Sequence, residues 1–221
     1  MVWGHGVDIR TFTPARRSED RRAELGSAGR PLVLHVGRLA VEKDPTTLVG
    51  SFRRVHSRLG EGAAFCVAGD GPEAAAVMDA LPFARHLGFL PRARLAELYA
   101  DADLFVFPSP SETCGLVALE AMASGLPVVG ADAGGIRENI IPGITGALVQ
   151  PGDVEGFAFA IQSLLLDSER RLAMGQAARA FAEGRDWRLE LDRLEVIYQS
   201  ARHTTSAVSA PKSWPTTTSV T

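Results

Sequence analysis

Residues 103–125, DLFVFPSPSETCGLVALEAMASG, join an apolar run to an apolar helix through a short polar turn. The run DLFVFP (103–108) is short and hydrophobic, as expected of a strand buried on both faces of a parallel sheet. The segment LVALEAMA (116–123) consists of strong helix formers, and Gly115 lets backbone amides approach a ligand closely. The stretch therefore predicts a buried strand, a turn and a helix, which is the repeating unit of an α/β protein.

The same unit recurs along the chain. Further apolar runs occur at PLVLHVG (31–37), AAFCVAG (63–69), 84–89 and PVVGA (127–131), and an edge strand is expected at 146–149. Helical spacing of apolar residues predicts helices over 48–59, 95–99 and 157–165, a helix from an N-cap at Ser168 to about Ala182, and a last helix from Trp187 to about Ala201. This alternation predicts an α/β fold with a doubly wound, Rossmann-like parallel sheet and helices on both faces.

The composition is that of a globular domain. The 221 residues carry a net charge of -3, which gives no general basic field for nucleic acid. Cys66 and Cys114 lie far apart outside any C-x-x-C pair, so we expect reduced, buried thiols. No apolar run reaches the roughly 18 residues that span a bilayer. We expect one domain over 1–203 and a disordered tail over 204–221, which is rich in Ser, Thr and Pro.

Ligands of such sheets bind at the carboxyl ends of the strands, where the loop after the first strand carries Gly37, Arg38 and Lys43. An Arg fork and a Lys ammonium could together neutralise a diphosphate. The alternative is two solvated cations that pair with Glu42 and Asp44. The loop by itself does not decide between the two.

Two carboxylates accompany the turn at 109–115. Glu112 precedes the helix and Glu120 lies within it, eight residues on, a spacing that lets both lean to the same side. The free amides of the helix start favour a phosphate, so the carboxylates need other partners, such as sugar or ribose hydroxyls. The alternatives are a dipole-stabilising role for Glu112 and a surface position for Glu120. Glu120, however, stands in an almost wholly apolar helix.

Other positions are weaker candidates. Asp70 lies in a GDGP turn after the second strand, and Gly134-Gly135 forms another loop suited to close approach. His35 is in mid-strand and is expected in the core. No histidine stands near a second ligand at metal-binding spacing, so no metal site is predicted.

The ordered set of motifs resembles one family. GVD (6–8), VGRLAVEKD (36–44), AGDGP (68–72), GFLP (88–91), LFVFPSPSETCGLVALEAMASGLPVV (104–129), AGG (133–135) and TGALVQPGD (145–153) are similar to the C-terminal domain of retaining group 1 (GT4) glycosyltransferases of the GT-B fold. The resemblance covers residues 3–202, and GVDIRTFTP (6–14) is most similar to mannosyltransferases that use GDP-mannose. The family usually carries an aromatic residue where this chain has Cys114.

The resemblance implies a role for each matching residue. Arg38 and Lys43 would hold the donor diphosphate, Glu112 the donor sugar hydroxyls and Glu120 the ribose hydroxyls. The rest of the donor site would be formed by Gly37, Thr113, Gly115 and Leu116 around the sugar and phosphates, Phe89 and Leu90 beside the base, and Asp70 and Gly71 shaping the pocket. No metal or other cofactor is implied, and the donor substrate would be a GDP- or UDP-hexose.

The implied activity is transfer of a hexose, such as mannose or glucose, to an acceptor hydroxyl with retention. The acceptor-binding N-terminal domain of the family has no counterpart here, so a non-catalytic or truncated nucleotide-sugar-binding module that needs a separate N-terminal half is the alternative. A GT-B epimerase or phosphorylase is a third reading, and phosphorylases need a pyridoxal lysine motif that is not found. The family implies a lipid or sugar acceptor and a cytoplasmic location, with contact at the inner membrane face left open.

Overall fold

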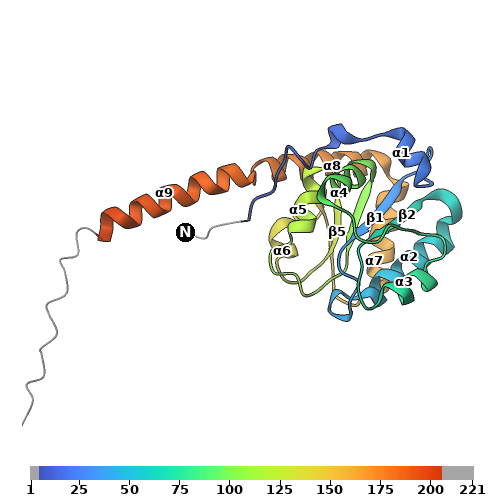
Figure 1. The fold of residues 1–221 in the computed structure, drawn as a ribbon. Coiled ribbons are helices and arrows are strands. Elements are labelled where there is room, and N and C mark those ends of the chain that lie inside the picture. Colours follow the sequence, from blue (N-terminus) through green and yellow to red (C-terminus); the bar gives the residue numbers. More distant parts are fainter. Residues whose placement is uncertain (1–4, 206–221) are drawn as a thin grey trace, which may run out of the picture.

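The computed structural model describes residues 5–205 and contains one parallel sheet (Figure 1). Its strands are β1 (Leu32–Val36), β2 (Ala64–Ala68), β3 (Arg85–His86), β4 (Leu104–Phe107), β5 (Val128–Ala131) and β6 (Gly146–Val149). The order is β3-β2-β1-β4-β5-β6, and every neighbouring pair is parallel. The predicted doubly wound sheet is confirmed, with all six strands at or near their expected positions.

Helices connect the strands and cover both faces of the sheet. They are α1 (Glu19–Glu24), α2 (Pro45–Leu59), α3 (Ala74–Ala80), α4 (Arg92–Asp101), α5 (Leu116–Ala123), α6 (Ile136–Asn139), α7 (Val154–Leu166), α8 (Ser168–Glu183) and α9 (Trp187–Thr205). Apolar spacing did not reveal α1, α3 or α6, which are short. The expected N-cap at Ser168 is wrong by one residue, because the Asp167 side chain caps α8 by accepting from the Arg170 amide at 2.9 Å.

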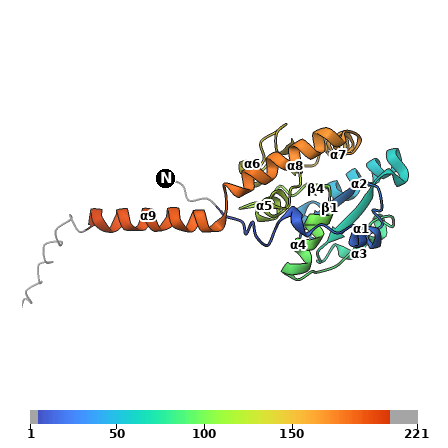
Figure 2. The same cartoon turned by 90° about the horizontal axis from the view of Figure 1, so that it is seen from above.

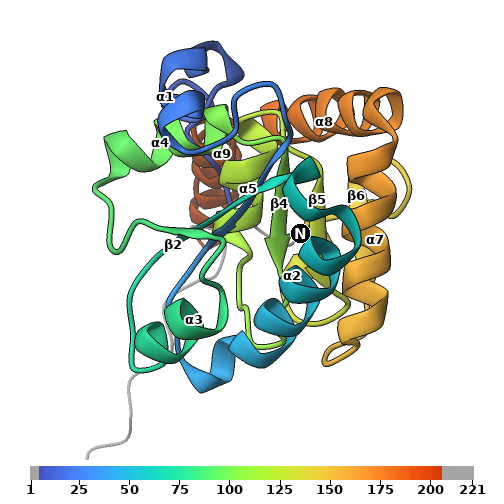
Figure 3. The same ribbon diagram turned by 90° about the vertical axis from the view of Figure 1, so that its right-hand side faces the viewer.

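The core consists of two apolar layers, one on each side of the strands. Leu32, Leu34 and Val36 face a layer built with α4 and α5 and with two alanines of α8. Val33 faces the other layer, which is built with α2, α3 and α7. Figure 3 shows α2 and α7 side by side on the near side of the sheet. The strands are buried on both faces, which explains why each reads as a continuous apolar run rather than as an alternating one.

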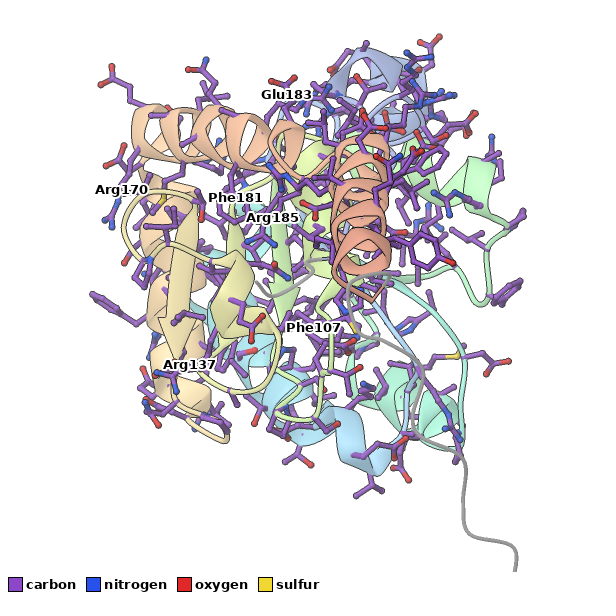
Figure 4. All side chains as sticks on the ribbon, turned by 90° about the vertical axis from the view of Figure 1, so that its left-hand side faces the viewer. Phe107, Arg137, Arg170, Phe181, Glu183 and Arg185 are labelled. Carbon is purple, nitrogen blue, oxygen red and sulfur yellow. The ribbon has the colours of Figure 1, made fainter. Side chains whose placement is uncertain are left out.

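The N-terminal segment is attached to the junction between α8 and α9. The amide of Val7 donates to the Arg185 carbonyl at 2.8 Å, and the amide of Trp187 donates to the Val7 carbonyl at 3.1 Å. The Arg185 guanidinium lies 5.3 Å from the centre of the Phe181 ring beside this junction (Figure 4). We refer to the two hydrogen bonds of Val7 as the terminal joint.

From the terminal joint, α9 points away from the sheet and its covering helices (Figure 2). The helix runs to Thr205, beyond the expected end near Ala201 and across the expected boundary between domain and tail. The remainder of the expected tail, 206–221, lies outside the described residues, as do residues 1–4. Within 5–205, no helix combines the length and the apolarity that crossing a bilayer requires.

Candidate functional site

The sheet has its topological switch point between β1 and β4. These strands are neighbours, yet the chain leaves β1 toward α2 on one face and leaves β4 toward α5 on the other. Two loops that diverge in this way open a crevice at the carboxyl edge of a parallel sheet, which is where such folds bind their ligands. The two loops, residues 37–44 and 108–115, are those in which the sequence places Lys43 and Glu112.

Lys43 and Glu112 meet across this crevice. Lys43 Nζ lies 3.0 Å from Glu112 Oε2 and donates to the Ser111 carbonyl at 3.3 Å. The two side chains are 21% and 19% exposed, so the pair is partly shielded from water. Ser111 Oγ also donates to the Glu42 carbonyl at 2.6 Å, which fastens the loops to each other. A cation and a carboxylate are therefore presented together at the switch point.

Arg38 is placed differently from Lys43. Its side chain is 64% exposed, and its Nη1 atom lies 3.4 Å from Glu42 Oε1. In this structure Arg38 therefore matches the alternative of a solvated loop cation. Asp44 is not a partner of either cation, because it caps α2 by accepting from the Thr47 amide at 3.0 Å and from the Thr47 hydroxyl at 2.6 Å.

A pocket of about 410 Å³ lies beside Arg38 and brings five predicted site residues together. It is lined by Gly37, Arg38, Asp70, Phe89 and Leu90, with four apolar or glycine neighbours completing the wall. Phe89 is 82% exposed in the wall of this pocket, so its ring is accessible to a ligand. A concave, largely apolar wall with one cation and one carboxylate at its edge suits a flat ring that carries polar groups.

Gly71 allows the loops after β1 and β2 to pack closely. A Cβ atom on Gly71 would lie 2.2 Å from the Leu39 carbonyl oxygen. The Leu39 amide donates to the Asp70 carbonyl at 3.0 Å, and Asp70 Oδ1 accepts from the Gly71 amide at 2.7 Å. Asp70 lines the pocket, and Gly71 lies next to it in the loop that packs against Leu39.

The turn before α5 is supported by a second glycine loop. Gly115 adopts a φ of 64°, and no side chain caps the helix that starts at Leu116. Gly134, with a φ of 53°, would place a Cβ atom 2.4 Å from the Glu112 carbonyl oxygen, and the Gly135 amide donates to that carbonyl at 2.7 Å. The close approach expected at Gly134-Gly135 is thus made to the protein backbone. An uncapped helix start remains available to an anion.

Asn139 is a residue of this site that sequence reasoning missed. Its buried side chain donates from Nδ2 to the Cys114 carbonyl at 3.1 Å and approaches the Gly115 carbonyl at 3.4 Å. These bonds hold the turn in place where the family's aromatic residue is replaced by half-buried Cys114. The sequence gives no clear signal for Asn139, because its neighbours Arg137 and Glu138 are polar as well.

Glu120 and Glu112 have different immediate neighbours. As predicted, the helix begins at Leu116, after Gly115 in a left-handed conformation, so Glu112 lies in the turn and Glu120 in the helix. Glu112 faces the loop after β1, whereas Glu120 faces Tyr99 and Arg92 of α4. Burial raises the pKa of Glu120 to about 7, against the opposing effects of the Arg92 charge and the Tyr99 hydroxyl.

The remaining predicted positions are found at the rim or in the core. Thr113 is exposed and Leu116 is 45% exposed, both at the start of α5. His35 is buried as expected: its Nδ1 lies 3.0 Å from the Val106 carbonyl, and burial lowers its pKa to about 4 against that hydrogen bond. Within residues 5–205, no cluster of three or more His, Cys, Asp or Glu side chains is arranged to hold a metal ion.

The fold is the Rossmann-like α/β fold that GT-B glycosyltransferases contain. The chain belongs to the family described as "Glycosyl transferases group 1", whose model matches residues 16–181. It is 45% identical over 209 residues to the sulfoquinovosyl transferase SQD2 of Arabidopsis thaliana, a match that covers 90% of this chain and 40% of that protein. It is 40% identical over 200 residues to a GDP-mannose-dependent alpha-mannosyltransferase of Mycolicibacterium smegmatis, covering 90% of this chain and 51% of that one.

A solved structure agrees with this assignment. HepE of Anabaena, determined in complex with UDP and glucose, superposes with a TM-score of 0.77 at 25% identity over 88% of this chain and 55% of that one. The chain thus spans about half the length of the proteins that it matches. The resemblance to group 1 glycosyltransferases is confirmed, and mannosyltransferases are among the relatives.

Proposed function

We propose that the chain is the donor-binding half of a glycosyltransferase that transfers a hexose from a nucleotide diphosphate sugar to an acceptor hydroxyl, with retention at the anomeric carbon. The observation that carries the proposal is the Lys43–Glu112 pair at the switch point, with an Nζ to Oε2 distance of 3.0 Å. The pair puts a phosphate-binding cation beside a hydroxyl-binding carboxylate, which is the combination that a sugar diphosphate requires.

The diphosphate would lie between the Lys43 loop and the start of α5. Lys43 would exchange part of its interaction with Glu112 for a phosphate oxygen, and Arg38 is exposed and free to swing from Glu42 toward the same group. The uncapped amides of Gly115 and Leu116 point their partial positive charge at this region. Fixed positive groups that face the leaving diphosphate would stabilise the charge that develops as the sugar departs, which requires no metal ion.

The two carboxylates would divide the hydroxyls of the donor. Glu112 would accept from the hexose, which has to lie next to the diphosphate. Glu120, one turn deeper along α5, would accept from the ribose. The base would then occupy the pocket of Gly37, Asp70, Phe89 and Leu90, and the exposed Phe89 ring offers it a surface for stacking.

The comparisons support a UDP- or GDP-linked hexose as donor. HepE was determined with UDP and glucose, and the mycobacterial relative is named for GDP-mannose. SQD2 is named for sulfoquinovosyl transfer and has the higher identity, so the match does not narrow the sugar to mannose. Mannose and glucose are the donors that we propose to test.

The acceptor would be held by a separate N-terminal half. The chain covers 40% and 51% of the lengths of its two relatives, which leaves room in those proteins for a second domain, and residues 1–203 would be the nucleotide-sugar domain. The acceptor would be a lipid or a sugar, met in the cytoplasm or at the inner face of the membrane. A module that binds the donor without catalysing transfer would share the same site and is distinguished by turnover.

Calorimetry with UDP, GDP, UDP-glucose and GDP-mannose tests the proposal. We expect the chain to bind at least one sugar nucleotide. Its affinity should fall tenfold or more in Lys43→Ala and in Glu112→Gln. Arg58→Ala is the matched control for Lys43→Ala. Arg58 lies on α2 and forms an exposed ion pair with Glu155 of α7, so its replacement removes a cation away from the site. Binding that is absent from the unmodified chain, or that is equal in Lys43→Ala and Arg58→Ala, contradicts the proposal. Transfer by the chain combined with its N-terminal half separates an enzyme from a binding module.

A further inference from the structure

The Tyr99 hydroxyl is buried and unsatisfied beside Glu120. Tyr99 is fully buried on the face of α4 that packs against α5, and its hydroxyl makes no hydrogen bond of full geometric quality within residues 5–205, although the Glu120 carboxylate lies near enough to act as its acceptor. The neighbouring group that acts on it is the Glu120 carboxylate, which adds to the effect of burial in raising the pKa of Tyr99 well above its ordinary value. A buried donor without an acceptor is uncommon and is disfavoured unless a partner is supplied. The group in place to supply it is Glu120.

The Tyr99 ring is held rigidly, so its hydroxyl has a defined position. The ring meets Phe12 edge to face with centroids 5.8 Å apart, and meets Phe105 of β4 at 5.5 Å. The hydroxyl therefore cannot move to another acceptor without breaking this aromatic packing. The carboxylate of Glu120, on a more exposed side chain that no ring packing holds, is the movable member of the pair.

Arg92 completes the environment of Glu120. Its guanidinium lies 5.1 Å from the centre of the Phe12 ring, and its Nη2 atom lies 3.8 Å from Asp8 Oδ2. Asp8 is itself fixed, because it accepts from the Thr11 hydroxyl at 2.7 Å and from the Thr11 amide at 3.1 Å. Arg92 is thus kept where its charge acts on Glu120. The groups whose charge or titration acts on Glu120 are Arg92 and Tyr99, both on α4, with Asp8 behind Arg92 on the N-terminal segment.

We propose that Tyr99 and Arg92 are positioning residues for Glu120, and that they orient its carboxylate to accept from the two ribose hydroxyls of the bound nucleotide. The inference rests on the proposed function, in which Glu120 binds the ribose. Tyr99 donates to one carboxylate oxygen and thereby fixes the plane of the group, which leaves the remaining lone pairs for the ribose. Arg92 favours the charged form of a carboxyl that burial disfavours.

The test compares the affinities of the chain for UDP and 2′-deoxy-UDP, and for GDP and 2′-deoxy-GDP, by calorimetry between about pH 6 and 9. We expect the unmodified chain to prefer the ribonucleotide by about tenfold, as for a hydrogen bond to a charged group. Tyr99→Phe keeps the aromatic packing and removes only the hydroxyl, and Arg92→Gln removes the charge together with the guanidinium contacts to Phe12 and Asp8. Both variants should reduce the preference to about two- or threefold. They weaken the contact between Glu120 and the 2′-hydroxyl, which the deoxy ligand lacks, so only the affinity for the ribonucleotide falls.

The pH profile gives a second readout that a purely structural role would not change. The Arg92 charge lowers the pKa of Glu120, so its removal should move the midpoint of ribonucleotide binding to higher pH, and Arg92→Lys should restore the profile of the unmodified chain. Arg94→Gln is the matched control, because Arg94 is also 62% exposed on α4 but pairs with Glu97. It should leave both the preference and the midpoint unchanged.

Each outcome decides something different. A chain that binds neither UDP nor GDP contradicts the proposed function and this inference with it. A chain that binds, but whose ribose preference survives Glu120→Gln, contradicts the role of Glu120 and of its positioning residues while leaving donor binding intact. A preference that is lost in Glu120→Gln but unchanged in Tyr99→Phe and Arg92→Gln overturns this inference alone. Equal weakening of ribo and deoxy ligands in the two variants also overturns it.

Discussion

Lys43 and Glu112 are 69 residues apart in the sequence, yet Nζ and Oε2 lie 3.0 Å from each other across the switch point of the sheet. The pair closes the crevice between the loops after β1 and β4. The ion pair links the two loops. A bound diphosphate would compete with Glu112 for the Lys43 ammonium, so ligand binding should weaken the pair.

The strength of this ion pair is measurable without a ligand. A double-mutant cycle with Lys43→Ala and Glu112→Gln should give a coupling free energy of about 1 kcal/mol, since both side chains are mostly but not fully shielded. The same cycle with Arg38→Ala and Glu42→Gln should give a value close to zero, because that pair is solvated and 3.4 Å apart. Urea denaturation measures both. Equal coupling in the two cycles would contradict the inferred difference in shielding.

Two features require glycine at position 134: its φ of 53°, and the lack of space for a Cβ atom. In Gly134→Ala the new Cβ would lie 2.4 Å from the Glu112 carbonyl oxygen, so the turn must shift and nucleotide-sugar affinity should fall. Gly143→Ala is the matched control, because Gly143 has a φ of 80° with no atom within 4 Å of its Cβ position. The control should lose about 1 kcal/mol of unfolding free energy from backbone strain alone and bind normally. Calorimetry and thermal denaturation of the two variants make the comparison.

Acid should destabilise the fold through His35. Burial lowers its pKa to about 4 in the fold, from the ordinary value of 6.5, so between those two pH values the unfolded chain binds a proton that the folded chain does not. The free energy of unfolding should therefore fall as the pH drops from 6.5 to 4, by up to about 3 kcal/mol from this residue. In His35→Leu, the free energy of unfolding should depend less on pH over this range, as measured by urea denaturation at each pH. An identical slope in both proteins would rule out this source.

The two thiols should differ sharply in reactivity. Burial raises the pKa of Cys66 to about 12, although Arg85 acts in the opposite direction, so iodoacetamide should leave this thiol unmodified until the chain unfolds. Cys114 is half-buried in the turn before α5 and should be alkylated in the folded chain. Under the proposed function, a bound sugar nucleotide should slow that alkylation. Mass spectrometry of peptides carrying each cysteine reports the rates, and native-state labelling of Cys66 as fast as Cys114 would refute the assignment.

The strands and the principal loops were predictable because their signals are local. A strand covered on both faces has to be apolar throughout, and PLVLHVG and DLFVFP show this directly. The loops that follow them had to lie at the same carboxyl edge, so Lys43 and Glu112 were predictable on one side of the sheet, whereas their contact depends on the strand order that makes β1 and β4 neighbours. The resemblance added the sugar and ribose roles, which no spacing on its own could provide.

The remaining features depend on contacts between distant residues. That Asn139 supports the turn at Cys114, and that Tyr99 and Arg92 surround Glu120, follows from how α6 and α4 pack, which no local pattern encodes. The start of α5 was predictable locally, because Gly115 precedes a run of strong helix formers and adopts the left-handed conformation that glycine favours. Asp167 displaced Ser168 as N-cap, because both residues are good caps and the choice depends on backbone geometry.

The terminal joint has a mechanical consequence. A Cβ atom on Gly6, next to Val7, would lie 2.3 Å from the Trp187 Cα. The backbones of the two segments are therefore in direct contact at this point. At a rise of about 1.5 Å per residue, the 19 residues of α9 form an arm about 28 Å long that starts at this contact. A tilt of about 10° at its base would carry the far end through about 5 Å. Torque applied to that end would therefore reach the polypeptide beside Asp8, and with it the side of the domain where Arg92 is held.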